Sequence, residues 1–279
     1  MAHQEATSLA PPPPFVVEAT STHTHSIVLL HGLGSNGEKF GRELLQTGIT
    51  SDGANLAQLL PNLKFIFPTS RRRRSSAFRR SVLTQWFDIA RLPDPAYRKE
   101  LQLKGLAESA QDLLQILQQE QETAHILPGH IILGGISQGI GGFVGMSGYL
   151  PFQADLDEAV TCDRGDGTQE DIFFMKDDDD NDGDIQDPAV KAIAFERDLL
   201  GLAPAGTLSR DCTACRTPIF LGHGSDDEKV PCSLGTAMAD TVAKADYNVE
   251  FKMYEGLGHW YKIPDEIDDI ANFLRRVLY

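Results

Sequence analysis

The chain has 279 residues, 41% of them hydrophobic, so it is long enough to bury a full core, and we expect a single large domain. No run of about 18 or more apolar residues occurs, and residues 1–10 carry no cleavable apolar segment, so neither a transmembrane helix nor a secretory signal is predicted. The four cysteines show no pattern typical of an oxidising compartment. These features predict a cytoplasmic protein with free thiols.

The net charge of −15 is concentrated in one segment. Residues 152–188 hold 14 acidic and two basic residues, so the rest of the chain carries only −3. This acidity argues against nucleic acid as a partner, and we expect residues 153–187 to form a disordered insert. Asp178, Asp180 and Asp182 imitate a calcium-binding loop, but Ala189 stands where the bidentate glutamate is needed. No metal site and no cofactor are therefore expected.

In chain order, residues 1–14 end in four prolines and are expected to form a disordered or extended leader before a domain at residues 15–279. The runs expected to be strands are residues 26–30, 63–67, 131–133, 219–222 and 249–254. The clearest amphipathic helices are expected at residues 101–118 and 264–278. Strands that alternate with such helices favour an α/β fold, with a mostly parallel sheet covered on both faces.

Residues 131–139 read Ile-Ile-Leu-Gly-Gly-Ile-Ser-Gln-Gly, an apolar strand pattern that ends in Gly-x-Ser-x-Gly around Ser137. This pattern is typical of the nucleophile elbow of serine hydrolases, where a tight turn needs small residues two places either side of the serine. A glycine-rich turn with an incidental serine would give the same pattern. The hypothesis that Ser137 is a nucleophile therefore depends on finding its catalytic partners.

A serine nucleophile needs a histidine to accept its proton and a carboxylate to orient that histidine. Asp226 and Asp227 follow the strand predicted at residues 219–222, and His259 lies in a glycine-containing loop before the last helix. The chain order Ser, Asp, His is that of the α/β-hydrolases. Chemistry alone does not distinguish Asp226 from Asp227. His223, which directly follows the same strand, is interpreted as structural.

A glycine-rich turn, His31-Gly32-Leu33-Gly34, follows the first strong strand. Such a turn can direct a backbone N–H at the carbonyl oxygen of a substrate. We expect Leu33 to supply this donor and Gln138, the residue after the nucleophile, to supply the second, each commonly worth about 3 to 4 kcal/mol in the transition state. His31 is interpreted as a residue that holds the loop.

With these segments in order, the chain resembles the acyl-protein thioesterase and carboxylesterase family of small cytosolic α/β-hydrolases. The resemblance covers about residues 15–150 and 189–279. The blocks that carry it are Leu30-His31-Gly32-Leu33-Gly34, Gln85-Trp86-Phe87-Asp88, Gly134-Gly135-Ile136-Ser137-Gln138-Gly139, His223-Gly224 with Asp227 and Val230-Pro231, and Gly258-His259. It implies an α/β-hydrolase fold with Ser137 as nucleophile, Asp227 as acid, His259 as base, and Leu33 and Gln138 as oxyanion donors.

The same resemblance implies hydrolysis of thioester or carboxylic ester bonds, with S-acylated proteins or lysolipids as substrates. It places Trp86 and Phe87, together with Leu33, at the acyl-binding site, although buried aromatic residues belong to the core at least as often. The arginines at residues 71–74, 79 and 80 are expected in a solvated loop whose charge would favour an acidic partner or transient contact with an anionic membrane surface.

The chain departs from its family directly after the elbow. Only Ile140 and Gly141 separate Gly139 from residues 142–151, which resemble the family's next strand and loop. The helix that should follow the nucleophile is missing, whereas a parallel crossover normally needs about 10 to 12 residues. We therefore expect either a displaced strand or an elbow without its supporting helix. The alternative function is that of a truncated or mis-spliced, catalytically impaired relative that binds acyl chains or a protein.

Overall fold

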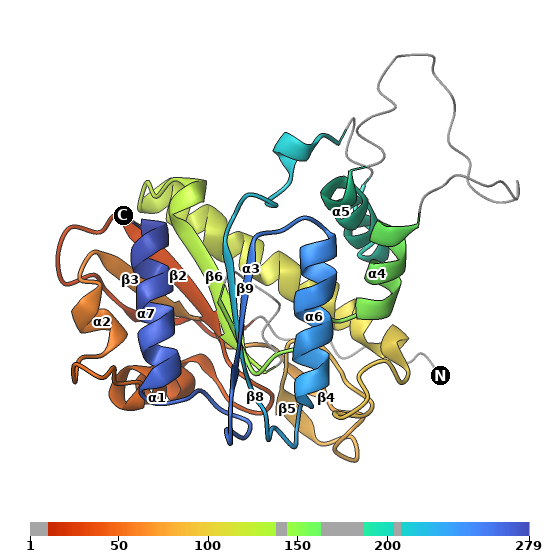
Figure 1. Cartoon of the computed structure of the whole chain (residues 1–279), viewed down its shortest axis with the longest axis horizontal. Helices are drawn as coiled ribbons and strands as arrows, with labels where there is room; N and C mark the ends of the chain where they lie inside the picture. Colours follow the sequence, from red (N-terminus) through yellow and green to blue (C-terminus); the bar gives the residue numbers. More distant parts are fainter. Residues whose placement is uncertain (1–10, 138–143, 163–186, 204–207, 279) are drawn as a thin grey trace, which may run out of the picture.

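A seven-stranded sheet forms the centre of the computed structural model, which describes residues 11–137, 144–162, 187–203 and 208–278 (Figure 1). The strand order is β1-β3-β2-β6-β7-β8-β9. All neighbouring strands are parallel except β1 and β3. The strands are β1 (Phe15–Val17), β2 (His25–Leu30), β3 (Leu63–Phe67), β6 (Ile131–Ile136), β7 (Val144–Met146), β8 (Ile219–Gly224) and β9 (Val249–Tyr254).

Helices cover both faces of this sheet because apolar side chains alternate along its strands. Ile27 and Leu29 of β2 pack with α1 and α7, whereas Val28 and Leu30 pack with α3 on the opposite face. Leu221 of β8 packs with α6 on the face of α3, and Figure 1 shows α6 and α7 on either side of β8 and β9. The helices are α1 (Gly37–Thr47), α2 (Leu56–Leu59), α3 (Leu103–Thr123), α4 (Gln153–Thr161), α5 (Pro188–Leu199), α6 (Cys232–Lys244) and α7 (Asp265–Leu278), with single turns η1 (Lys99–Gln102), η2 (Pro128–His130) and η4 (Arg210–Cys212). The predicted α/β fold is confirmed.

The arginine-rich segment is a β-hairpin, so the expectation of a solvated loop is correct only for part of it. Strands β4 (Arg72–Arg74) and β5 (Val82–Thr84) pair antiparallel. Arg71 binds Asp112 of α3 through two hydrogen bonds of 2.7 and 2.6 Å, and Arg73 pairs with Glu108 of the same helix. Alternation along the strand explains this difference, because every second arginine faces α3 while the others face solvent.

The first residues of the segment expected to be disordered form a helix, α4. Prediction of disorder from residue 153 is wrong for α4, because Leu156 and Val160 of this helix are buried against Ala192 of α5. The Oδ1 atom of Asp187 accepts the backbone N–H groups of Ala189 and Val190 and so caps α5. The acidic residues Asp178, Asp180 and Asp182 lie outside the described residues. Of the leader, residues 11–14 are described and form neither helix nor strand.

Strand β7 keeps its expected place between β6 and β8, although no family-like crossover precedes it. Its register pairs Gly134 with Val144 and Ile136 with Met146. The alternative of a displaced strand is therefore wrong. Gly139 and residues 140–143 lie outside the described residues.

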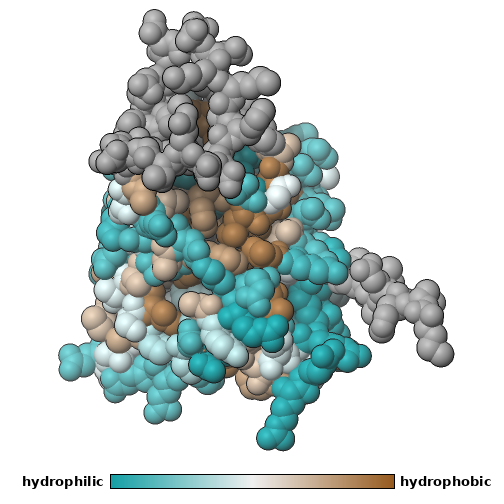
Figure 2. All heavy atoms as spheres, turned by 90° about the vertical axis from the view of Figure 1, so that its right-hand side faces the viewer, coloured by the Kyte–Doolittle hydropathy of each residue, from teal (hydrophilic) through white to brown (hydrophobic). Residues whose placement is uncertain are grey.

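Figure 2 views the molecule from the side of α4 and α5 and shows apolar side chains gathered among hydrophilic ones. In this part of the fold Phe152 and Leu200 are partly buried against the core, and Leu202 is 44% exposed. Among the residues that the structure describes, no helix is both long and apolar enough to cross a membrane.

Candidate active site

Ser137 lies directly after β6, at the carboxyl edge of the sheet. Its φ of 63° is in the left-handed region that non-glycine residues rarely adopt, as a nucleophile elbow requires. The backbone N–H of Ser137 donates to the carbonyl oxygen of Met146 in β7 at 2.9 Å. A side chain on Gly32 would place its Cβ 3.2 Å from the Cβ of Ser137, so the loop after β2 passes directly beside the serine.

His259 and Asp227 complete a chain of hydrogen bonds that begins at Ser137. The Nε2 atom of His259 lies 2.9 Å from Oγ of Ser137, and its Nδ1 atom lies 2.7 Å from Oδ2 of Asp227. Asp227 comes from the loop after β8 and His259 from the loop after β9. Ser137 and Asp227 are 90 residues apart in the chain, and α6 and β9 lie between Asp227 and His259. The folded sheet brings the three side chains together.

The surroundings of Asp227 keep its carboxylate ionised. Burial alone would raise the pKa of Asp227, but hydrogen bonds from His223 and His259 and from the N–H of Val230 outweigh it and hold the pKa well below its usual range. Its Oδ1 atom accepts the N–H groups of Lys229 and Val230 at 2.9 Å each. Asp226 is exposed, and among the described residues its carboxylate accepts a hydrogen bond only from the hydroxyl of Ser225. The folded structure therefore distinguishes Asp227, which binds His259, from Asp226, although the two residues are chemically equivalent.

His223 supports the loop that carries Asp227. It is 1% exposed, and its Nε2 lies 2.9 Å from the carbonyl oxygen of Val230 and 3.5 Å from Oδ2 of Asp227. Gly235 of α6 makes room for it, since a Cβ there would lie 2.3 Å from Nδ1 of His223. The geometry matches the structural interpretation of His223, because its ring faces the loop carbonyl and not Ser137.

His31 holds the glycine-rich loop that carries Leu33. Its Nδ1–H donates to the carbonyl oxygen of Gly32 at 2.7 Å, and its Nε2 accepts the N–H of Ser70 at 3.0 Å. Burial lowers the pKa of His31 to about 4, against the opposing effect of its bond to Gly32, so this ring is neutral at physiological pH. A neutral ring can accept and donate at the same time, which ties the loop after β2 to Ser70 in the segment after β3.

The hairpin fixes the same loop from the other side. The N–H of Gly34 donates to the carbonyl oxygen of Thr84 at 2.8 Å, and the hydroxyl of Thr84 donates to the carbonyl oxygen of Ser35. No sequence pattern indicates this support, because Thr84 belongs to no motif. Leu33 itself is partly buried beside this anchored turn. Gln138, the second expected oxyanion donor, lies outside the described residues.

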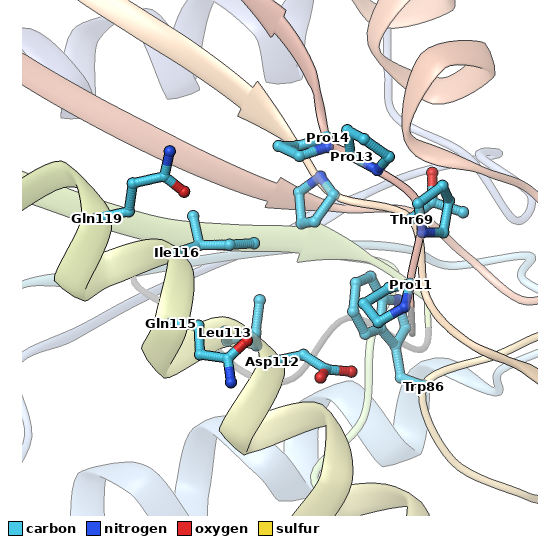
Figure 3. A pocket seen from close by; sticks show the side chains of 12 residues that line it. Pro11, Pro13, Pro14, Thr69, Trp86, Asp112, Leu113, Gln115, Ile116 and Gln119 are labelled. Carbon is cyan, nitrogen blue, oxygen red and sulfur yellow. The ribbon is translucent and has the colours of Figure 1, made fainter. Parts of the chain in front are cut away.

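Trp86 and Phe87 are core residues in this structure, each 1% exposed. The indole N–H of Trp86 donates to the carbonyl oxygen of His31 at 2.8 Å, so this side chain supports the loop that carries Leu33. Figure 3 shows Trp86 at a cavity of about 240 Å³ beside Pro11 and side chains of α3. The described residues that line this cavity include no member of the Ser137 cluster. A role for Trp86 and Phe87 in substrate binding stays a prediction.

The position of this site within a parallel sheet defines the class of fold, which is that of the α/β-hydrolases. Two solved structures support the fold. Acyl-protein thioesterase 2 from Zea mays aligns with a TM-score of 0.60 at 24% identity, covering 95% of this chain and 99% of its own. Esterase PE8 aligns with a TM-score of 0.61 at 18% identity over the same shares.

The family follows from sequence comparison. The model of the phospholipase/carboxylesterase family matches residues 12–163 and 201–278, and the chain belongs to this family. Similar proteins include acyl-protein thioesterase 1 of Gibberella zeae, 26% identical over 285 residues and covering 95% of each chain. Acyl-protein thioesterase 1 of Saccharomyces cerevisiae is 27% identical over 260 residues, covering 91% of this chain and 92% of its own. The expected family resemblance is confirmed.

Proposed function

We propose that the chain is a serine hydrolase that cleaves thioester or carboxylic ester bonds, with Ser137 as nucleophile. The observation that carries this proposal is the hydrogen-bonded series Ser137, His259 and Asp227, in which the serine occupies a left-handed elbow at the carboxyl edge of the sheet. Such a series converts a weakly nucleophilic hydroxyl into one whose proton is removed as it attacks.

In the first half-reaction Oγ of Ser137 attacks the acyl carbonyl carbon, and its proton passes to Nε2 of His259. His259 then returns that proton to the leaving thiolate or alkoxide as the carbon–sulfur or carbon–oxygen bond breaks, which leaves an acyl-serine. In the second half-reaction water gives a proton to His259 and attacks the acyl-serine, releasing a carboxylic acid and restoring Ser137. Asp227 stays ionised throughout and stabilises the imidazolium that forms twice in each cycle.

The oxyanion that forms in both half-reactions needs backbone donors beside Ser137. We assign this role to the N–H groups of Leu33 and Gln138. The close approach of Gly32 to Ser137 and the anchoring of its loop by His31 and Thr84 support the assignment of Leu33. A donor held before the reaction costs no reorganisation when charge develops, which is why such anchoring favours catalysis.

S-acylated proteins are the substrate class that we favour, with lysolipids and short esters as weaker candidates. The names of the similar proteins support this choice, since each of the curated relatives described above is an acyl-protein thioesterase. A cytoplasmic location would suit this substrate class and stays a prediction. We propose Leu33, Trp86 and Phe87 as the acyl-binding residues, of which only Leu33 is more than 1% exposed in this structure.

A fluorophosphonate probe tests the nucleophile directly, because it reacts only with an activated serine. We expect labelling of the wild-type chain at Ser137 and none in Ser137→Ala. Hydrolysis of an S-palmitoyl peptide, a p-nitrophenyl ester and a lysophospholipid, compared at equal concentration, then ranks the substrates. Labelling that persists in Ser137→Ala would remove this residue from its role. Retained binding of a fatty acid without any turnover would favour the alternative, a catalytically silent binding protein.

We also propose that the hairpin contacts an anionic membrane surface near the site. Arg72, Arg74, Arg79 and Arg80 are exposed, and the neighbouring Phe78 and Val82 are 43% and 47% exposed. Arg71 and Arg73 pair with acidic residues of α3. The positive charge that remains for a membrane surface therefore lies on the outer face of the hairpin. Basic residues near an anionic surface contribute about 1 kcal/mol each, and exposed apolar side chains add to the attraction.

Sedimentation with vesicles of phosphatidylcholine, with or without phosphatidylserine, tests this contact. Binding should require phosphatidylserine and weaken at high salt. The double variant Arg72→Glu, Arg74→Glu should lose it. A matched control is Arg216→Glu, Arg275→Glu, which makes the same change in net charge at two exposed arginines outside the hairpin. Equal losses in both double variants would show that net charge, and not the hairpin, governs binding.

A further inference from the structure

Ser147 is a buried serine in an unfavourable backbone conformation, directly after β7. It is 1% exposed, and its φ of 49° lies in the left-handed region. A non-glycine residue in this conformation is strained, and such strain persists only where the surroundings impose it. Glycine would adopt the same conformation freely. The presence of serine therefore points to a use for its side chain.

The contacts of Ser147 join the two halves of the site. Its N–H donates to the carbonyl oxygen of Gly222 in β8 at 2.8 Å, and its hydroxyl donates to the carbonyl oxygen of Trp260 at 3.0 Å. Trp260 directly follows His259. The residue before Ser147, Met146, accepts the backbone N–H of Ser137 at 2.9 Å. Two adjacent residues, the last of β7 and the first after it, are thus bonded to the backbone of the serine elbow and to the loop that carries His259.

These bonds matter because the distance between His259 and Ser137 depends on two separate loops. The His259 loop comes from β9 at the edge of the sheet, whereas Ser137 follows β6, with β7 and β8 lying between them. The hydroxyl of Ser147 bridges this gap at the residue next to the imidazole. Among the described residues, Ser147 supplies the side-chain hydrogen bond to the carbonyl oxygen of Trp260.

We propose that Ser147 is a positioning residue, whose hydroxyl holds the His259 loop at the distance at which the imidazole can take the proton of Ser137. This role rests on the proposed function, since it presupposes that Ser137 and His259 act as nucleophile and base. Among the described residues Ser147 makes no hydrogen bond to the side chain of Ser137 or of His259, so its effect passes through the backbone of Trp260.

The strained φ provides a way to separate this role from ordinary structural support. Ser147→Gly removes the hydroxyl and relieves the strain, so its melting temperature should equal or exceed that of the wild type. Ser147→Ala removes the same hydroxyl but keeps the strain, so it should melt at a lower temperature. Both variants should lose kcat on an ester substrate by about tenfold, the effect expected for one lost hydrogen bond, with KM within about twofold. The reaction rate of Ser137 with a fluorophosphonate should fall in parallel.

A spectroscopic signal tests the imidazole itself. The proton shared by Nδ1 of His259 and Asp227 should give a low-field NMR resonance in the wild type, which should broaden or shift in Ser147→Gly. The matched control is His125→Gly, which relieves a similar φ of 56° at an exposed residue and should change neither kcat nor this resonance.

The outcomes distinguish the two proposals. An active wild type and a Ser147→Gly variant with unchanged kcat would contradict the role of Ser147 alone. A wild type that neither hydrolyses esters nor reacts with the probe would contradict the proposed function, and this role with it. A loss of kcat in Ser147→Ala that is absent in Ser147→Gly would assign the effect to stability and would also overturn the proposal.

Discussion

The carboxyl group of Glu266 occupies the space in which a side chain at Gly222 would begin, since a Cβ atom there would lie 2.1 Å from its Oε1. Glu266 belongs to α7 and is 1% exposed. Its Oε2 accepts the backbone N–H of Lys262 at 2.9 Å, in the loop that carries His259. Burial raises the pKa of Glu266 to about 8, opposed by the bond from Lys262 and reinforced by Asp269. The group is therefore protonated at neutral pH only while the chain is folded.

This raised pKa predicts a loss of stability as pH rises. The folded chain binds one more proton than the unfolded chain between the unfolded pKa of Glu266, near 4.5, and its folded pKa of about 8. The contribution of Glu266 to the free energy of unfolding should therefore be most favourable below pH 4.5, decrease between pH 4.5 and 8, and stay constant above pH 8. Glu266→Gln keeps an acceptor for Lys262 and removes the titration, so at pH 9 it should exceed the wild type by a few kcal/mol in unfolding free energy.

Urea unfolding of both chains at pH 5, 7 and 9 measures this difference. The gap between Glu266→Gln and the wild type should widen with pH. Asp265→Asn serves as the control, because this neighbouring acidic residue lies in the same turn of α7 but is exposed. A constant gap at all three pH values would show that Glu266 does not titrate in this window.

Asp227→Asn should reduce kcat/KM far more than Asp226→Asn. The amide would still fit the site but would favour the wrong tautomer of His259, and such a loss in a triad is on the order of 10³ to 10⁴. Asp226 is exposed and contacts Ser225, so its replacement should cost less than about threefold. Kinetics of both variants on one p-nitrophenyl ester decide between them, and a greater loss in Asp226→Asn would reverse the assignment.

The acidic insert should be removable, provided that its ends are left intact. Deleting residues 163–186 should leave kcat/KM and stability nearly unchanged, because loops close at an entropic cost that depends weakly on length. Extending the deletion to Asp187 should destabilise the chain by about 1 kcal/mol, because Asp187 caps α5 and pairs with Arg210 at 2.7 Å. Thermal unfolding and ester hydrolysis of both deletions measure these effects. A large loss of activity in the shorter deletion would give the insert a catalytic role.

The short connection between β6 and β7 predicts impaired folding. The family's helix after the nucleophile would bury further apolar surface, and each Å² so buried contributes roughly 25 cal/mol toward a stability margin of about 5 to 15 kcal/mol. We expect a chain with a family-like helix inserted after Gly139 to give more soluble protein and more esterase activity than the 279-residue chain. Equal yield and equal kcat/KM in the two would show that the short connection is sufficient.

By itself, the sequence determined the features that depend on local patterns. Alternating and helical periodicities predicted β3 and β9 to the residue, and β2, β6, β8, α3 and α7 with shifted ends. The Gly-x-Ser-x-Gly pattern located Ser137, because only small residues fit that turn. The family resemblance located Asp227 and His259 in the chain, and the structure brought both to Ser137. Their catalytic roles remain proposals.

The tertiary structure alone decided what depends on contacts between distant segments. It directs the side chain of Asp227, and not that of Asp226, toward His259. It also stabilises α4 as a helix, because apolar residues of this acidic segment pack against α5. It placed alternate arginines against α3 and the hydroxyl of Ser147 against Trp260. None of these contacts has a local signature, because each is set by which elements the folded sheet brings together and by the free energy of burying their side chains there.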